Sequence, residues 1–337
     1  MKRTLIFFLF LAAFCQPLFP KGDRDPEREL VVYTYDSFSS EWGPGPAIAA
    51  AFFDETGISI EFHAPGDAIT TLNQLILEKN GSQADLVIGL DNSLLSRILD
   101  ADILEPYETP LLDFLPPEYV FDKSNRLIPY DYGHFAICYD SQMLKTPPTS
   151  LEDLTSKEYE KSLVLMDPRT STPGLGFLLW TMSAYGDRWP DYWKRLKPSI
   201  LTIANGWSQG YTLLVTGEAP MVLSYGTSPV YHVEYEESSR YKAAEFSDGH
   251  LMQIEGMGIL KGSEMRQEAE LFIDFMLGEF SQKILAMSNI MLPVMKNVSL
   301  PTSFEAALRP GKIIPGSSTD TEELQNAIDI WTEIFSR

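Results

Sequence analysis

Residues 127–139 read LIPYDYGHFAICY, and this stretch decides the fold. It holds two apolar, strand-like runs, Leu127–Asp131 and Phe135–Tyr139, on either side of the polar and glycine-containing segment 131–134. We interpret the interruption as a crossing of the chain from one lobe to another. A second crossing is expected at Gln253–Lys261, a strand rich in glycine.

Two crossings predict two lobes with a ligand cleft between them. One lobe is expected to contain residues 29–130 plus 256–310, and the other residues 134–252. Residues 311–337 are expected to form a C-terminal helix that packs on the lobes. A length of 337 residues, 44% of them hydrophobic, provides enough apolar side chains for two cores of this kind.

Around the crossings, short apolar runs alternate with longer segments of helical period, which is typical of an α/β protein. Most runs are apolar on both faces, as in a buried parallel sheet. Strands are expected at 30–35, 58–63, 84–89, 127–131, 135–139, 162–166, 200–204, 221–224 and 251–260. Helices are expected at 46–56, 68–79, 92–100, 172–185, 189–196, 208–216, 264–277, 280–287 and 321–335.

The net charge excludes one large class of partners. The chain has 47 acidic and 26 basic side chains, a formal charge of −21. Binding a phosphate backbone requires a concentrated positive surface that releases counterions. Nucleic acid is therefore not an expected partner.

The N-terminus has the layout of a secretory signal. Lys2 and Arg3 precede an apolar run, Leu5–Phe14, which is shorter than the roughly 20 residues of a membrane-spanning helix. We expect residues 1–22 to direct export to the periplasm. Cys15 directly after the run suggests a lipid anchor as an alternative to a plain signal, although Phe14 is bulky for that cleavage site.

Segment 167–176 leaves a predicted strand and enters an apolar helix that starts with a proline. Free backbone N–H groups at the helix start, together with the hydroxyls of Ser171 and Thr172, could bind a phosphate or carboxylate. Simple capping of the helix is the alternative. Segment 224–231 repeats this order with Tyr225, Thr227 and Ser228 before a helix that contains Tyr231.

Aromatic side chains gather at the predicted ends of strands, next to Gly, Asp or Ser. Tyr35, Trp42, Trp207 and Tyr225 are examples. Such rings suit a flat ligand, and a cationic one better, because the ring face attracts positive charge. Asp36, Asp67 and Asp91 also follow predicted strands, where open α/β sheets bind ligands. Asp67 and Asp91 could instead cap helices.

Signals for catalysis and for metal binding are weak. The four histidines are scattered, and no nucleophile elbow or phosphate-binding loop is present. Cys138 lies within a predicted buried strand, four residues from His134, a separation of about 13 Å on a strand. We expect a non-catalytic protein without a cofactor or a metal.

Eight segments together resemble the family of periplasmic thiamine-binding proteins of bacterial ABC importers, in collinear order from about residue 30 to 300. They are 33–38 with 42–46, 84–92, 129–133, 167–176, 206–208, 223–232 and 246–250. The resemblance implies a type II periplasmic-binding-protein fold, with two α/β lobes joined by two crossings. It also implies binding of thiamine, thiamine monophosphate or thiamine diphosphate.

The resemblance also implies roles for single residues. Asp67 and Ala68 match the Asp-Gly pair that holds the aminopyrimidine end, with Tyr35 and Trp42 nearby. Ser171 and Thr172 match the hydroxyl pair at the phosphate or hydroxyethyl end. The other matched ligand-binding positions are Trp207, Tyr225, Gly226, Thr227, Ser228 and Tyr231.

The clearest departure from the family lies at residues 289–294. Ile290 stands where relatives carry a ring-stacking Trp, and Leu292 where they carry a Tyr. The loss of aromatic stacking is worth on the order of 0.5 to 1.5 kcal/mol beyond the area buried. The departure therefore bears on affinity and on the preferred phosphorylation state.

The sequence thus predicts a monomeric solute receptor that delivers thiamine or its phosphates to an ABC permease. One alternative is a receptor for another small cationic solute or for ferric iron. Another is an envelope-anchored interaction protein that has kept the fold, which the loss of the Trp at Ile290 favours. An enzyme acting on thiamine is a third option and would need a nucleophile in the cleft.

Overall fold

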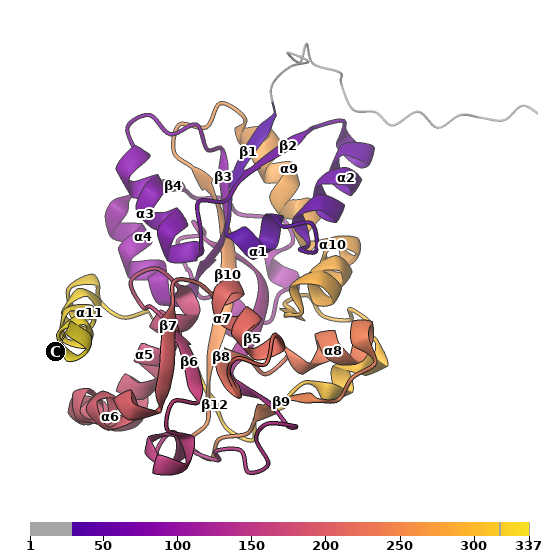
Figure 1. The fold of residues 1–337 in the computed structure, drawn as a ribbon. Coiled ribbons are helices and arrows are strands. Elements are labelled where there is room, and N and C mark those ends of the chain that lie inside the picture. The colour runs from indigo at the N-terminus through magenta and orange to yellow at the C-terminus, as the bar shows by residue number, and fades with distance from the viewer. Residues whose placement is uncertain (1–28, 317, 337) are drawn as a thin grey trace, which may run out of the picture.

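The computed structural model describes residues 29–316 and 318–336. These residues form two α/β lobes, one above the other in Figure 1, which share one mixed sheet. The order of the main strands is β2-β1-β3-β10-β5-β8-β6-β7. The predicted signal segment 1–22, with Cys15, lies outside the described residues.

The first lobe surrounds the parallel strands β2, β1 and β3. Its strands are β1 (Leu30–Tyr33), β2 (Ile60–His63), β3 (Leu86–Asp91) and β4 (Leu104–Glu105). Its helices are α1 (Asp36–Ser39), α2 (Gly45–Thr56), α3 (Ala68–Glu78), α4 (Leu95–Ala101), α9 (Arg266–Leu277) and α10 (Glu279–Ile284). Buried side chains such as Phe38, Phe52 and Phe272 form its core.

The second lobe is built in the same way on the parallel strands β7, β6 and β8. Its strands are β6 (Leu163–Met166), β7 (Ile200–Ala204), β8 (Met221–Tyr225) and β9 (Tyr241–Ala244). Its helices are α5 (Thr172–Tyr185), α6 (Trp189–Leu196), α7 (Trp207–Val215) and α8 (Pro229–Glu236). Trp180 and Trp193 are fully buried in its core.

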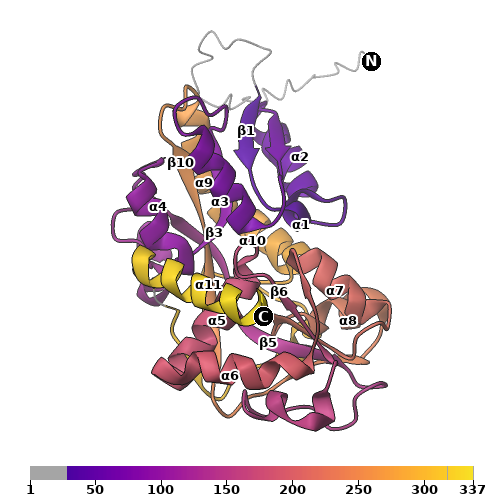
Figure 2. The ribbon, with the colours of Figure 1, turned by 60° about the vertical axis from the view of Figure 1, so that its left-hand side comes forward.

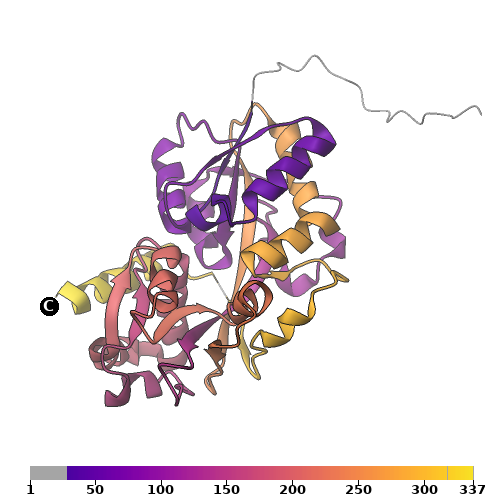
Figure 3. The same ribbon diagram turned by 45° about the vertical axis from the view of Figure 1, so that its right-hand side comes forward.

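Two long strands connect the lobes, β5 (Ile128–Asp140) and β10 (His250–Leu260). Residues 128–134 of β5 pair with β10, whereas residues 135–140 pair with β8 and β9 of the second lobe. Figure 3 shows the lobes joined along the orange strand β10. The two-lobed α/β fold expected from the sequence is confirmed by this arrangement and by the solved structures described below.

Two details of the sequence prediction are wrong. Segment 131–134 does not interrupt the strand, because its backbone continues the ladder with β10 and the chain passes between lobes without a turn. The sheet is also mixed rather than parallel, since β10 runs antiparallel to β3 and β5, and β5 runs antiparallel to β8 and β9. The short strands β4, β9, β11 (Leu292–Pro293) and β12 (Ile313–Ile314) were not predicted.

The C-terminal helix α11 (Thr321–Ser336) packs against α4 of the first lobe and α6 of the second. Figure 2 shows it between these helices. Thr321 Oγ1 donates to Asp100 Oδ2 at 2.6 Å on the first side. On the other side the buried ring of Trp331 packs edge to face on Trp193, with centroids 5.9 Å apart. The helix therefore contacts both lobes.

Candidate functional site

A cavity of about 460 Å³ lies between the two lobes. Its walls come from the loop after β1, the starts of α3 and α5, one side of α7 and of α8, the end of β8, Glu255 of β10, and residues 288–291. Ten of the thirteen residues predicted from the sequence line it. They are Tyr35, Trp42, Asp67, Thr172, Trp207, Tyr225, Thr227, Ser228, Tyr231 and Ile290.

The other three predicted residues do not line the cavity. Ala68 is buried beside it, and its N–H donates to Asp67 Oδ1 at 2.7 Å. Gly226 donates its N–H to the carbonyl of His134 and accepts from the N–H of Leu308. Ser171 is fully buried, and its hydroxyl donates to Asp67 Oδ2 at 2.7 Å.

Asp67 connects the two lobes. Its Oδ2 accepts from Ser171 Oγ at the start of α5 and from the N–H of Trp207, the first residue of α7, at 3.1 Å. Two helix N-termini of the second lobe thus face a carboxylate of the first, which is the arrangement that a helix dipole favours. Ser171 was predicted to bind the phosphate or carboxylate of a ligand. In the structure the anion that it contacts is the carboxylate of Asp67. Burial raises the pKa of Asp67, and its three hydrogen bonds oppose that shift.

Aromatic rings form much of the cavity wall. Trp207 stacks on Tyr211, with centroids 5.0 Å apart, and lies 6.4 Å from the half-exposed Trp42 across the cleft. The indole N–H of Trp207 donates to Ser224 Oγ at 2.8 Å, which holds the ring in place. The hydroxyl of Tyr225 donates to Gln253 Oε1 at 3.0 Å. These contacts fix the ring positions before any ligand arrives.

A buried hydroxyl in the described lining of the cavity, that of Thr227, has no hydrogen-bond partner. Thr227, at the turn before α8, is 3% exposed, and its Oγ1 makes no hydrogen bond. A buried hydroxyl without a partner is costly, on the order of 1 to 3 kcal/mol. Ser228 beside it contacts Ser224 Oγ at 2.7 Å. Thr227 is therefore placed to bond a polar ligand group.

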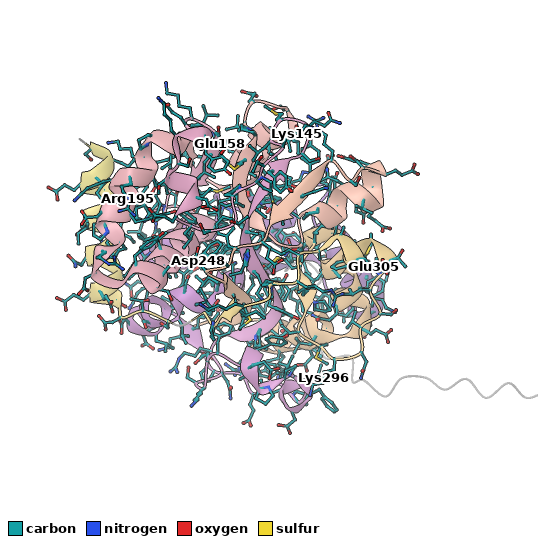
Figure 4. The ribbon with its side chains drawn as sticks, turned by 90° about the horizontal axis from the view of Figure 1, so that it is seen from below. Lys145, Glu158, Arg195, Asp248, Lys296 and Glu305 are labelled. Carbon is teal, nitrogen blue, oxygen red and sulfur yellow. The ribbon has the colours of Figure 1, made fainter. Side chains whose placement is uncertain are left out.

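Carboxylates predominate among the titratable groups on the cavity wall, and the basic side chain in the described lining is His232, whose Nδ1 lies 2.7 Å from Glu236 Oε2. Asp36, Asp67, Glu236 and Glu255 line it, and its described lining includes no lysine or arginine. Figure 4 instead shows basic side chains such as Lys145 and Arg195 around the outside of the ribbon. Such a cavity favours a ligand with positive charge and flat rings.

Comparison with known proteins places the chain in a family. The family described as bacterial extracellular solute-binding protein matches residues 82–311. The chain belongs to this family. It is a family of transport receptors rather than of enzymes.

Several relatives of this solute-binding protein carry a more specific name. The thiamine-binding periplasmic protein of Salmonella typhimurium is 38% identical over 338 residues, all of both chains. Its namesake in Brucella melitensis is 39% identical over 92% of this chain and 91% of that protein. The thiamine-binding periplasmic protein of Escherichia coli is 37% identical over 91% of this chain and 94% of that protein. The resemblance drawn from the sequence is confirmed.

Solved structures agree with this family assignment. A periplasmic thiamin binding protein superposes with a TM-score of 0.87 at 37% identity, over 95% of this chain and all of that one. The iron-bound HitA of Pseudomonas aeruginosa superposes with a TM-score of 0.73 at 24% identity, covering 91% of this chain and 99% of that one. At that identity HitA shows the shared fold alone.

The departure at Ile290 has a clear structural setting in this solute-binding protein. Ile290 lines the cavity and follows a π-helical turn, Leu285–Asn289, with its backbone at φ 55°. A β-branched residue in this left-handed region is strained, and strain of this kind gathers at ligand sites. The turn brings Asn289 Nδ2 to 2.8 Å from Asp131 Oδ2. Leu292 pairs with Tyr132 instead and does not line the cavity.

Sequence reasoning missed several lining residues, and some had a detectable signal. Ser208, Tyr211, Thr212 and Val215 recur at helical spacing after Trp207, so one face of α7 could have been predicted to line the cleft. Glu255 and Asn289 had no comparable local signal. They reach the site because β10 and the π-helical turn meet there in the tertiary structure.

Neither a membrane span nor a metal cluster was found in the part of the chain that the structure describes. No helix there is long and apolar enough to cross a bilayer. No group of three or more His, Cys, Asp and Glu side chains in residues 29–316 and 318–336 is arranged to hold a metal ion.

Proposed function

We propose that this chain is a periplasmic receptor that captures thiamine, thiamine monophosphate or thiamine diphosphate and delivers it to an ABC importer. The observation that carries the proposal is the cavity between the lobes, with aromatic walls and acidic charges. Thiamine combines two flat rings with a permanent positive charge, so it matches both features. The names of the relatives point to the same ligand.

Each part of the ligand has a counterpart on the wall. The rings of Trp207, Tyr211 and Tyr225 provide faces for the thiazolium cation and the pyrimidine. Thr227, with its unpaired hydroxyl, and the N-terminus of α8 provide donors for the hydroxyethyl group or its phosphate. Asp67 lies at the opposite, first-lobe side.

Closure of the lobes would be a population shift driven by contacts to both sides. Asp67 already bonds Ser171 and Trp207 across the cleft, and Ser208 Oγ donates to Asp36 Oδ1 at 3.2 Å. A ligand that touches Tyr35 on one lobe and Trp207 on the other would add to these contacts. The crossing strands β5 and β10 would bend to permit the motion.

The proposal describes binding without catalysis. The described residues contain one cysteine, Cys138. It is buried in β5, and its thiol donates to the carbonyl of Tyr225 at 3.3 Å. Burial raises the pKa of its thiol to about 12. A thiol in that state is a poor nucleophile, because the thiolate is the reactive form.

Calorimetric titration of purified residues 23–337 with thiamine, its monophosphate and its diphosphate tests the proposal. Submicromolar binding of any of the three would support it and rank the ligands. No binding of all three would overturn it. The same titration with ferric iron and with other cationic ring compounds would then separate the remaining receptor functions from a surface interaction protein.

A further inference from the structure

Three carboxyl groups form a row across the sheet where the lobes meet. In the pairing register, Glu255 of β10 lies opposite Asp91 of β3 on one side and opposite Asp131 of β5 on the other. Residues opposite each other in a ladder present their side chains to the same face. We call Asp91, Glu255 and Asp131 the carboxyl row. They are 1%, 5% and 0% exposed, and Glu255 lines the cleft.

The carboxyl row has no basic partner in the described part of the chain, where no ion pair includes any of its members. Glu255 Oε2 accepts from Tyr130 at 2.8 Å and from Tyr35 at 3.1 Å. Its Oε1 accepts from Gln253 Nε2 at 3.2 Å. Asp131 Oδ2 accepts from Asn289, and the carboxyl groups of Asp131 and Glu255 are hydrogen-bonded to each other.

The titratable groups that interact with the carboxyl row are acids and tyrosines, and the basic side chain in the described lining of the cavity is His232, which is hydrogen-bonded to Glu236. Tyr35 follows β1, Asp67 precedes α3, Tyr130 lies on β5 and Tyr225 ends β8. Ser93 bonds Asp91, and the amides of Gln253 and Asn289 complete the surroundings. Several buried carboxyl groups so close together cannot all be ionised without a cation.

We propose that the carboxyl row recognises the positive charge of the bound ligand, and that binding expels a proton from the row to the solvent. This inference rests on the proposed function, because it assigns the ligand's cation to a particular wall of that cleft. An observation independent of the acids also indicates a polar ligand there. Thr227 Oγ1, in the lining of the same cavity as Glu255, is buried and lacks a partner.

The direction of the proton transfer follows from the burial of the row. Burial raises the pKa of Asp91 to about 7 and raises that of Asp131 well above its ordinary range, with Glu255 adding to both shifts. Burial also raises the pKa of Glu255. The empty row therefore holds protons near neutral pH. A cation in the cleft stabilises the ionised form, so a proton leaves and affinity increases with pH, by as much as tenfold per unit for one proton.

Titration of the wild-type protein with thiamine, in two buffers of different ionisation enthalpy at pH 6.5, counts the protons released. We expect about one per ligand, and tighter binding at pH 8 than at pH 6. A neutral isostere, 3-deazathiamine, has carbon in place of the charged nitrogen. It should bind more weakly than thiamine at pH 8 and release no proton.

The variant Glu255→Gln keeps the size of the side chain and one oxygen acceptor but removes its charge. We expect it to lower thiamine affinity at pH 8 at least about tenfold and to leave 3-deazathiamine affinity within about twofold. Asp274→Asn is the matched control. Asp274 also accepts a tyrosine hydroxyl, from Tyr107 at 2.9 Å, but does not line the cleft, so proton release and affinity should be unchanged.

The outcomes separate the two proposals. Thiamine binding without proton release, and with equal affinity for the neutral isostere, would overturn the role of the carboxyl row and leave the proposed function standing. Absence of thiamine binding to the wild-type protein would overturn both. The wild-type titrations decide the matter even if Glu255→Gln fails to fold.

Discussion

Two kinds of buried carboxyl group lie at the cleft or directly beside it, and they differ in their hydrogen-bond donors. Asp67, at the contact between the lobes, receives three donors and faces two helix N-termini. The carboxyl row on β3, β10 and β5 has like groups as neighbours, and two of its members, Asp131 and Glu255, are hydrogen-bonded to each other. The negative charge of Asp67 is thus stabilised by hydrogen-bond donors of the protein itself. The carboxyl row has no cationic partner in the described residues, so a positively charged ligand can stabilise its ionised form.

The largest expected effect is at Asp67. Replacing Asp67 by Ala leaves Ser171 Oγ and the N–H of Trp207 buried without an acceptor. We expect thiamine affinity to fall on the order of 100-fold, about 2.7 kcal/mol, in calorimetric titration. Asp36→Ala removes an exposed carboxylate that also bonds across the cleft, through Ser208. A loss for Asp36→Ala as large as that for Asp67→Ala would contradict the role of the buried donors.

The next effect concerns stability and Asp91. The folded pKa of about 7 lies above the ordinary 3.8, so folding takes up a proton and the free energy of unfolding decreases as pH rises from 5 to 7. One such group contributes about 2 kcal/mol over that interval. Urea denaturation of the ligand-free protein should show this slope, and Asp91→Asn should reduce it. If the free energy of unfolding depended on pH equally in both proteins, Asp91 would not be a group that takes up a proton on folding.

A smaller effect is expected at the aromatic wall. Trp207→Ala removes a ring that stacks on Tyr211 and keeps the backbone N–H that bonds Asp67. We expect at least a tenfold loss of thiamine affinity, about 1.4 kcal/mol, without unfolding. Trp207→Phe keeps a ring and should recover part of the loss. An unchanged titration curve for Trp207→Ala would contradict the site assignment.

The smallest effect is a gain. Ile290→Trp places a ring on the cavity wall where the family resemblance leads us to expect one, and stacking should tighten thiamine binding by about 0.5 to 1.5 kcal/mol. Leu292→Tyr is the control, because Leu292 pairs with Tyr132 and does not line the cavity. Weaker binding by Ile290→Trp would mean that the cleft has been reshaped around isoleucine.

Much of the fold was readable from local patterns. The helix starts at Thr172 and Trp189, and the strand 200–204, lie where sequence reasoning placed them. Segment 131–134 was expected to separate two strands, because its polar side chains and its glycine interrupt the apolar pattern. In the structure the backbone of these residues stays in the ladder with β10, and Asp131 lies opposite Glu255 in the carboxyl row. Local composition reports the surroundings of a side chain and does not separate a functional strand from a loop.

The sequence by itself determined the alternation of strands and helices, the crossings and the aromatic positions, because these depend on neighbours within about one helical turn or strand. Only the tertiary structure decided which carboxylates meet. Asp67 reaches partners 104 and 140 residues away, and Glu255 lies between Asp91 and Asp131 through the register of β10. That register shifts at bulges on both sides of Gly256. A shift of one residue turns a side chain to the other face of a sheet, and local patterns in one sequence do not record it.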